Sequence, residues 1–251
     1  MMQALYSAKT GVNTQQLRID TIANNIANIN TTGFKAGRIS FKDAMYTAIA
    51  RAPQTTGNNL QNGCGLLISA TTQDFKQGIP VLTGEPLDMC IEGDGFFTLM
   101  GPGGTLQYTR NGSFAVSEEQ GGSYLVSTQG YYVLDAGGQK IKLPQLQDIN
   151  VSPEGALSIG TGAPFATLGI ASFDNNAGLQ NVGASCFSPT PASGAARRAT
   201  GFTVRQGALE GSNVDLAREL TQLIRAQRAF SLVGKAITTA DEMEAAANNM
   251  R

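Results

Sequence analysis

Two heptad patterns, one at each end of the chain, constrain the fold more than any other feature of the sequence. Near the N-terminus, mostly apolar side chains recur every seven positions along two lines that start three residues apart. The first line is Leu5, Val12, Ile19 and Ile26, and the second is Ala8, Gln15, Ile22 and Ile29. This spacing is typical of helices that pack along a seam. We therefore predict one helix from Met1 to about Asn30.

The C-terminal end carries a similar pattern. One line is Leu216, Leu223, Phe230 and Ile237, and the second is Leu220, Gln227 and Gly234. We predict a helix to about Asn248. Ser212 and Asp215 have capping-box spacing at its start, and Asn213 is an alternative cap. A chain with a seam at each end and a different middle is typical of a subunit that assembles.

The middle of the sequence predicts β structure. Short apolar or alternating runs between residues 86 and 203 are separated by glycine-rich turn signals about ten residues apart, a pattern of all-β domains. Asn111-Gly112 predicts a two-residue hairpin turn, which needs positive φ. Residues 36–85 predict an extended connector, with a short helix over 41–50 and strands over 66–82.

These patterns together predict an α+β fold, mainly β, with coiled-coil-like helices at both ends. The expected segments are an N-terminal assembly helix, the connector, an inserted all-β outer domain, and a C-terminal strand with an assembly helix. Their boundaries are 1–35, 36–85, 86–203 and 204–251.

Histidine is absent from the sequence, and charged residues make up only 15% of it, with a net charge of −1. Without histidine the chain has no Ser-His-Asp or Cys-His catalytic arrangement and no His-ligated metal site. The balance of charge has no basic footprint for nucleic acid. We therefore expect no catalytic residue, no cofactor, no metal and no nucleic-acid partner. Few charges among many uncharged polar side chains suit surfaces that meet other proteins.

The three cysteines, Cys64, Cys90 and Cys186, are widely spaced and form no CxxC motif. Isolated cysteines are most often buried small apolar residues. A Cys64–Cys90 disulfide is the alternative in an oxidising compartment.

Glu92 and Asp94 are the best carboxylate pair for acid–base chemistry, with Glu85 and Asp88 near them. Glycoside hydrolysis needs two carboxylates across a cleft. Here they fall on a predicted strand and a glycine turn with no second signal, so we interpret them as structural. The sequence also lacks a usual signal peptide and any apolar run of membrane-spanning length. We expect a cytoplasmic protein or one exported without a cleaved signal, and no direct membrane insertion.

Four elements resemble the bacterial flagellar rod and hook protein family. The first is TIANNIANINTTGFK, residues 21–35. The others are IEGDGFF, residues 91–97, YTRNGSF, residues 108–114, and the tail from Gly207 to Met243. The four elements in this order cover nearly the whole chain. The overall run and the connector after Tyr46 are most similar to the distal part of the rod, and the proximal part is the closest alternative.

The resemblance implies a structural protein that leaves the cell uncleaved through the flagellar type III export apparatus. It implies a helical homopolymer that transmits torque, in which the two terminal helices pair and line the core and the β domain forms the outer layer. The implied partners are further copies of the chain, neighbouring rod and hook proteins, surrounding ring proteins and the export apparatus. The implied location is the periplasm-spanning rod of the basal body.

The predicted self-assembly residues are the seam positions and three asparagines before the end of the first helix. They are Leu5, Val12, Ile19, Ile22, Asn24, Asn25, Ile26, Asn28, Leu216, Leu220, Leu223, Phe230 and Ile237. For the asparagines, hydrogen bonds between subunits and capping of the helix end both stay open. We also expect the end helices to be largely disordered in the free chain, because two helices alone bury too little apolar surface to offset the ordering entropy. A secreted β-rich adhesin, a phage tail-like protein and an enzyme are the alternatives, and none of them explains both seams.

Overall fold

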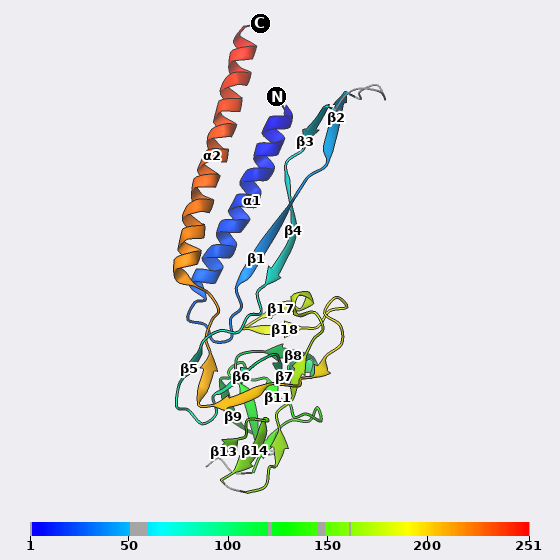
Figure 1. The fold of residues 1–251 in the computed structure, drawn as a ribbon, viewed down its shortest axis with the longest axis vertical. Helices are drawn as coiled ribbons and strands as arrows, with labels where there is room; N and C mark the ends of the chain where they lie inside the picture. Colours follow the sequence, from blue (N-terminus) through cyan, green and yellow to red (C-terminus); the bar gives the residue numbers. More distant parts are fainter. Residues whose placement is uncertain (1, 51–59, 120–121, 145–148, 161, 251) are drawn as a thin grey trace. The chain divides into compact units, whose positions relative to one another are not determined.

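The computed structural model describes residues 2–50, 60–119, 122–144, 149–160 and 162–250, and the chain divides into two compact units (Figure 1). The helix unit comprises Met1–Ala27, Gly37–Gln73 and Asp215–Arg251. The β unit comprises Asn28–Ala36 and Asp74–Val214. The predicted α+β fold, mainly β with end helices and an inserted β region, is confirmed.

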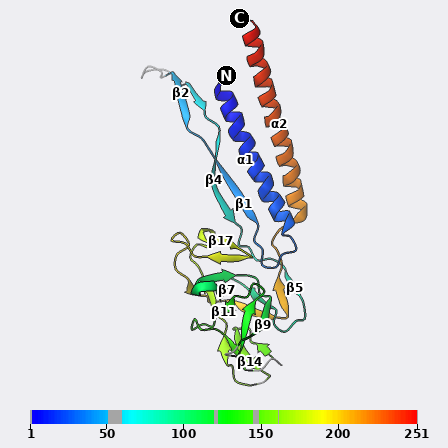
Figure 2. The ribbon, with the colours of Figure 1, turned by 180° about the vertical axis from the view of Figure 1, so that it is seen from behind.

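The helix unit pairs the two ends of the chain. Helices α1 (Met2–Ala27) and α2 (Leu216–Asn249) lie side by side, as Figures 1 and 2 show. Strands β1 (Gly37–Asp43) and β4 (Leu66–Gln73) form an antiparallel ribbon that packs against α1. Strands β2 (Tyr46–Ala50) and β3 (Leu60–Gly63) pair in the same way.

The prediction of a helix over residues 41–50 is wrong, because β1 and β2 occupy most of this stretch. Phe41 lies opposite Ile68, and Lys42 lies opposite Leu67 in the ladder with β4. A short apolar run has no decisive period of its own, so a distant strand that supplies the backbone hydrogen bonds determines its conformation. The strands predicted over 66–82 are confirmed by β4 and β5.

In the residues of the β unit that the structure describes, the elements are short strands and two single-turn 3₁₀ segments. The strands are β5 (Pro80–Leu82), β6 (Met89–Glu92), β7 (Phe96–Met100), β8 (Leu106–Thr109), β9 (Phe114–Glu119), β10 (Gly122–Ser127), β11 (Tyr132–Val133), β12 (Lys142–Leu143), β13 (Ile149–Val151), β14 (Ala156–Ile159), β15 (Ala166–Thr167), β16 (Ile170–Ser172), β17 (Gln180–Gly183), β18 (Cys186–Ser188), β19 (Arg197–Arg198), β20 (Thr203–Gln206) and β21 (Ala208–Glu210). The 3₁₀ segments are Pro102–Gly104 and Asn176–Gly178.

The main sheet runs in the order β12-β10-β11-β7-β8-β18-β17, with β9 on β10 and β16 between β7 and β19. Neighbouring residues of β7 serve two cores, because side chains alternate across a strand. Phe97 lies in the larger apolar cluster with Met89 and Leu125, whereas Phe96 lies in an aromatic cluster with Phe187. Strands β6 and β20 pair beside the larger cluster, and β5 pairs with β21.

The Asn111-Gly112 hairpin is a second wrong prediction. Strand β8 pairs with β7 and β18, and β9 pairs with β10. Gly112 does not have positive φ; its carbonyl instead accepts a 3.0 Å hydrogen bond from the Met89 amide. A Cβ at this position would lie 1.6 Å from the Met89 oxygen. Glycine is thus required by the close approach of two backbones, which the dipeptide alone does not distinguish from a turn.

Candidate assembly site on the end helices

The two end helices run antiparallel in a register fixed by two contacts. Asn25 Nδ2 of α1 donates to Glu219 Oε2 of α2 at 3.3 Å. Gly11 lies fourteen residues before Asn25 on α1, and Val233 lies fourteen residues after Glu219 on α2. A Cβ on Gly11 would lie 3.3 Å from Val233 Cγ1. The helix pairing is therefore direct, and Gly11 allows the backbones to approach closely.

On its α1 side, α2 buries the polar Glu219 and the small Ala226 and half-buries Val233. Glu219, Ala226 and Val233 are spaced by seven, and we call them the inner line of α2. Ala226 is only 1% exposed. On α1, Gly11, Thr14 and the predicted seam residue Ile22 are also buried. Because side chains of this size leave little apolar area to bury, close backbone packing contributes much of the contact between α1 and α2.

Asn25 joins three elements of the helix unit. Its amide donates to the Gly37 carbonyl at 3.0 Å and accepts from the Gly37 amide at 2.8 Å, which ties α1 to β1. Its third contact is Glu219. Asn24 is exposed on α1, and Asn28 accepts hydrogen bonds from Thr31 just after the helix. At least two of the predicted asparagines, Asn25 and Asn28, therefore bond within their own chain.

The predicted seam of α1 lies beside its buried face. Ile22 is buried, whereas Leu5, Val12, Ile19 and Ile26 are half-buried. These four side chains keep part of their apolar surface open along one edge of α1.

The predicted seam of α2 lies mostly in the open. We call Leu216, Leu220, Leu223, Phe230 and Ile237 the α2 stripe. Leu216 and Leu220 are each 44% exposed and Phe230 is 37% exposed, while Leu223 and Ile237 are half-buried. At about 100° per residue, the stripe lies roughly 40–100° round the helix from the inner line. Within one chain, α1 thus covers the inner line and leaves the α2 stripe largely uncovered. Apolar side chains at this spacing are typical of a helix face that packs against another helix.

Asp215 is the N-cap of α2, so the predicted caps Ser212 and Asn213 are wrong and the helix begins three residues later than the capping-box spacing indicated. Asp215 Oδ1 accepts from the amides of Ala217 at 3.0 Å and Arg218 at 3.3 Å. Ser212 Oγ accepts from the Val214 amide, and the Asn213 side chain bonds to the backbones of Ala36, Asp74 and Lys76.

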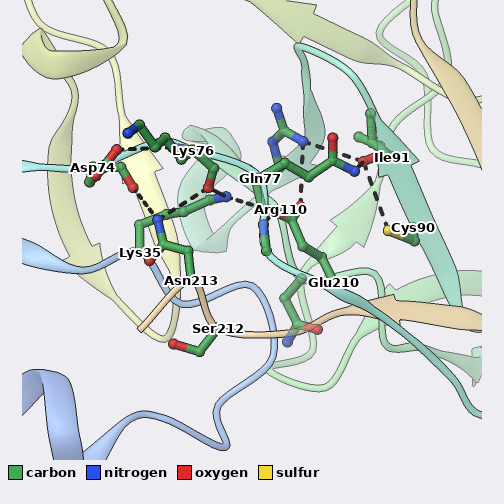
Figure 3. A network of polar contacts seen from close by, with 12 residues as sticks. Lys35, Asp74, Lys76, Gln77, Cys90, Ile91, Arg110, Glu210, Ser212 and Asn213 are labelled. Atoms are coloured by element: carbon green, nitrogen blue, oxygen red, sulfur yellow. Dashed lines mark hydrogen bonds and ion pairs between the residues drawn. The ribbon is translucent and has the colours of Figure 1, made fainter. Parts of the chain in front are cut away.

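The β unit contains a buried group of charges that sequence reasoning missed, shown in Figure 3. We call the side chains of Lys35, Arg110 and Glu210 the ion cluster. Lys35 Nζ lies 2.6 Å from Glu210 Oε1, and Arg110 Nη1 lies 3.4 Å from Glu210 Oε2. All three side chains are almost completely buried.

Backbone groups supply further hydrogen bonds to the ion cluster. Glu210 Oε1 also accepts from the Gly78 amide at 2.9 Å, and Lys35 Nζ donates to the Lys76 carbonyl at 2.7 Å. Arg110 donates to the carbonyls of Ile91 and Gly93. Burial lowers the pKa of Lys35, and the adjoining Glu210 carboxylate opposes that shift.

Asn213 ties the same region together without charge. Its Oδ1 accepts from the Ala36 amide at 2.8 Å, and its Nδ2 donates to the carbonyls of Asp74 at 2.6 Å and Lys76 at 3.1 Å. A signal for this region was present in the sequence. Lys35, Arg110 and Glu210 all lie in elements that carry the family resemblance, in a chain with few charges.

The remaining candidates of the sequence have structural surroundings. Glu92 forms an exposed 3.5 Å ion pair with Arg205, and Asp94 is exposed. Cys90 and Cys186 are buried thiols. Burial, followed by the nearby Glu210 and Glu92 carboxylates, raises the pKa of the Cys90 thiol to about 11. In the described part of the chain, no three Cys, Asp or Glu side chains gather as metal ligands would.

Comparison with known proteins identifies the family. The chain is 40% identical to the flagellar basal-body rod protein FlgG of Borreliella burgdorferi, covering all of this chain and 99% of the relative. The chain belongs to the flagellar basal-body rod protein family. It is also 41% identical to FlgG of Agrobacterium fabrum, over 96% of this chain and 97% of the relative. The flagellar hook-basal body complex protein FlhP of Bacillus subtilis is 30% identical over the full length of both chains.

Family models match three parts of the chain, and together they include both end helices. Residues 5–35 match the flagella basal body rod protein model, and residues 90–159 match the flagellar hook protein FlgE/F/G D1 domain. Residues 205–250 match the C-terminal model of flagellar basal body rod FlgEFG proteins. The resemblance found in the sequence is confirmed, and with it a structural role in the flagellar basal body. In the described residues, neither helix is long and apolar enough to cross a membrane.

Proposed function

We propose that this chain is a subunit of the distal part of the flagellar rod, and that it stacks with copies of itself into a helical tube that carries torque toward the hook. The observation that carries the proposal is the α2 stripe. After α1 has covered the inner line, α2 still presents apolar side chains at heptad spacing, with Leu216 and Leu220 each 44% exposed. The full-length match to proteins named as basal-body rod proteins supports the same role.

The partner we propose for the α2 stripe is the open edge of α1 in a neighbouring subunit. Leu5, Val12, Ile19 and Ile26 are spaced by seven and remain half-buried within their own chain. The two surfaces differ, so the contact is heterologous. A repeated heterologous contact that does not close produces an open helical filament rather than a ring. Asn24 is exposed on a different face of α1, about 160° round the helix from Ile26, so its proposed bond to a neighbouring subunit would lie outside this edge.

Further partners follow from the proposed place in the rod. The chain would meet neighbouring rod and hook proteins at the ends of its segment, the surrounding ring proteins at its outer face, and the export apparatus on its way out. It would lie in the rod that spans the periplasm, after export without a cleaved signal. No catalytic or cofactor role is proposed. The proximal rod and the hook are the nearest alternatives, whereas the relatives give no support to an adhesin or a phage tail protein.

A pair of substitutions on α2 tests the proposal. Leu220 lies in the α2 stripe, whereas Leu232 is 66% exposed and lies on nearly the opposite side of the helix. In a host strain that lacks its own copy of the gene, Leu232→Asp should restore swimming and complete basal bodies. Leu220→Asp should be exported but leave basal bodies without a distal rod and hook. Normal basal bodies with Leu220→Asp would contradict the proposed contact.

A further inference from the structure

The ion cluster is unbalanced, since two cations share one carboxylate. Glu210 pairs with both Lys35 and Arg110 in a space from which water is almost excluded. Asp74 adds only a weaker favourable field at Lys35. Loss of the Glu210 charge would therefore leave two buried cations without their partner, whereas loss of the Lys35 charge would leave a balanced pair.

The ion cluster and Asn213 join three segments of the β unit that are far apart in the sequence (Figure 3). These segments are 33–36, 74–78 and 210–213. The Gly33 amide donates to the Glu210 carbonyl at 2.8 Å, and the Asp74 amide donates to the Ala36 carbonyl at 2.9 Å. Each segment ends at or near a place where the chain passes from the β unit to the helix unit, at residues 36–37, 73–74 and 214–215.

Polar contacts, rather than apolar packing, hold most of these segments. In the three segments, all of which the structure describes, Phe75 is the one side chain packed against an apolar cluster of the β unit. The larger cluster is built from strands such as β6, β7 and β10. Opening of the three segments would thus break ionic and backbone hydrogen bonds while most of the apolar core stays buried.

We propose that the ion cluster holds the three segments together, and with them the places where the chain leaves the β unit. The three segments can separate from one another while the apolar core of the β unit stays folded. Lys35, Arg110 and Glu210 are accordingly positioning residues. They set where the chain leaves the β unit toward α1, β1, β4 and α2. The proposal concerns the free chain and does not depend on the role in the rod.

Hydrogen exchange of the purified full-length chain, followed by mass spectrometry, tests the proposal with two matched pairs of variants. Glu210→Gln is compared with Glu92→Gln, which makes the same change in an exposed ion pair. Lys35→Met is compared with Lys76→Met, whose side chain is exposed. In wild type, the amides of the three segments should exchange slowly.

Glu210→Gln should speed exchange in the three segments about a hundredfold, because it leaves two unpaired buried cations. Lys35→Met should speed it by about tenfold, because the Glu210–Arg110 pair remains. The two controls should stay within about twofold of wild type. In every variant, β7 and β10 should keep wild-type protection.

Two results would overturn the proposal. Unchanged exchange in the three segments of both cluster variants would mean that the ion cluster does not hold them. Equal acceleration in β7 and β10 would mean that the ion cluster is part of the core and cannot open by itself. Should Glu210→Gln fail to fold, Lys35→Met decides between the same results, since its remaining charges are balanced.

Discussion

Truncation of one leucine in the α2 stripe should weaken polymerisation by an amount that the structure sets. Once α1 and α2 have formed, Leu220 is 44% exposed, so the contact with a neighbouring subunit can bury at most that part of it. Complete burial of a leucine contributes about 1.5–3 kcal/mol, and 44% of that is roughly 0.7–1.3 kcal/mol. Since 1.4 kcal/mol is a factor of ten, Leu220→Ala should raise the critical concentration about three- to ninefold.

The matched control is Leu232→Ala. Leu232 is more exposed than Leu220, at 66%, but lies on the other side of α2 from the stripe. Its truncation should change the critical concentration less than twofold, as is usual for surface sites outside a contact. The assay is sedimentation of the purified chain over a concentration series. An equal effect of both substitutions, or no effect of Leu220→Ala, would refute the assignment of the contact to the α2 stripe.

Four further predictions concern the two units. Ile19→Asp should abolish polymers while near-ultraviolet circular dichroism of the β unit stays as in wild type; normal polymers would argue against the α1 edge. Gly112→Ala should destabilise the β unit by about 3 kcal/mol or more in urea unfolding. The control Gly138→Ala, at a glycine with positive φ but open space around it, should cost about 1 kcal/mol. Equal costs would mean that the close approach of the Met89 backbone is not what requires glycine at position 112. The pKa of the Cys90 thiol, about 11, lies above its ordinary value of 9.0. The contribution of this thiol to the free energy of unfolding is therefore complete below pH 9 and is lost as the pH rises toward 11. Cys90→Ala should lack this part of the pH dependence of stability, and a pH profile identical to that of wild type would contradict the raised pKa. Helix content by circular dichroism should be lower in the free chain than in the polymer, and equal content would rule out helix formation on assembly.

The heptad pattern predicted both end helices but not their contact. On α2, two neighbouring lines recur every seven residues, one apolar and one of smaller or polar side chains. Sequence reasoning selected the apolar line, with Leu216 and Phe230. In the structure, α1 takes the inner line with Ala226, because Gly11 and Ala226 allow close packing. Periodicity gives the faces of a helix and does not say which neighbour covers each face.

The three residues of the ion cluster lie in elements that carry the family resemblance, but their pairing could not be predicted, for a different reason. Lys35 and Glu210 are 175 positions apart, and no local pattern reports on a pair that only the complete fold brings together. Gly112 illustrates the same limit at short range. Asn-Gly has the chemistry of a tight turn, yet its glycine is required by a strand from another part of the sequence. The start of α2 shows this limit as well. The Asp215 cap depends on amides only two and three residues away, but the capping-box spacing pointed to Ser212, and Asn213 is held instead by bonds to Ala36, Asp74 and Lys76.

The most direct test of the account is electron microscopy of the full-length chain beside residues 28–214, which comprise the β unit and the Gly37–Gln73 part of the helix unit but lack both end helices. Both proteins would be purified and concentrated under the same conditions. We predict helical tubes from the full-length chain and compact single particles from residues 28–214. Tubes of the same kind from residues 28–214 would contradict assembly through the end helices.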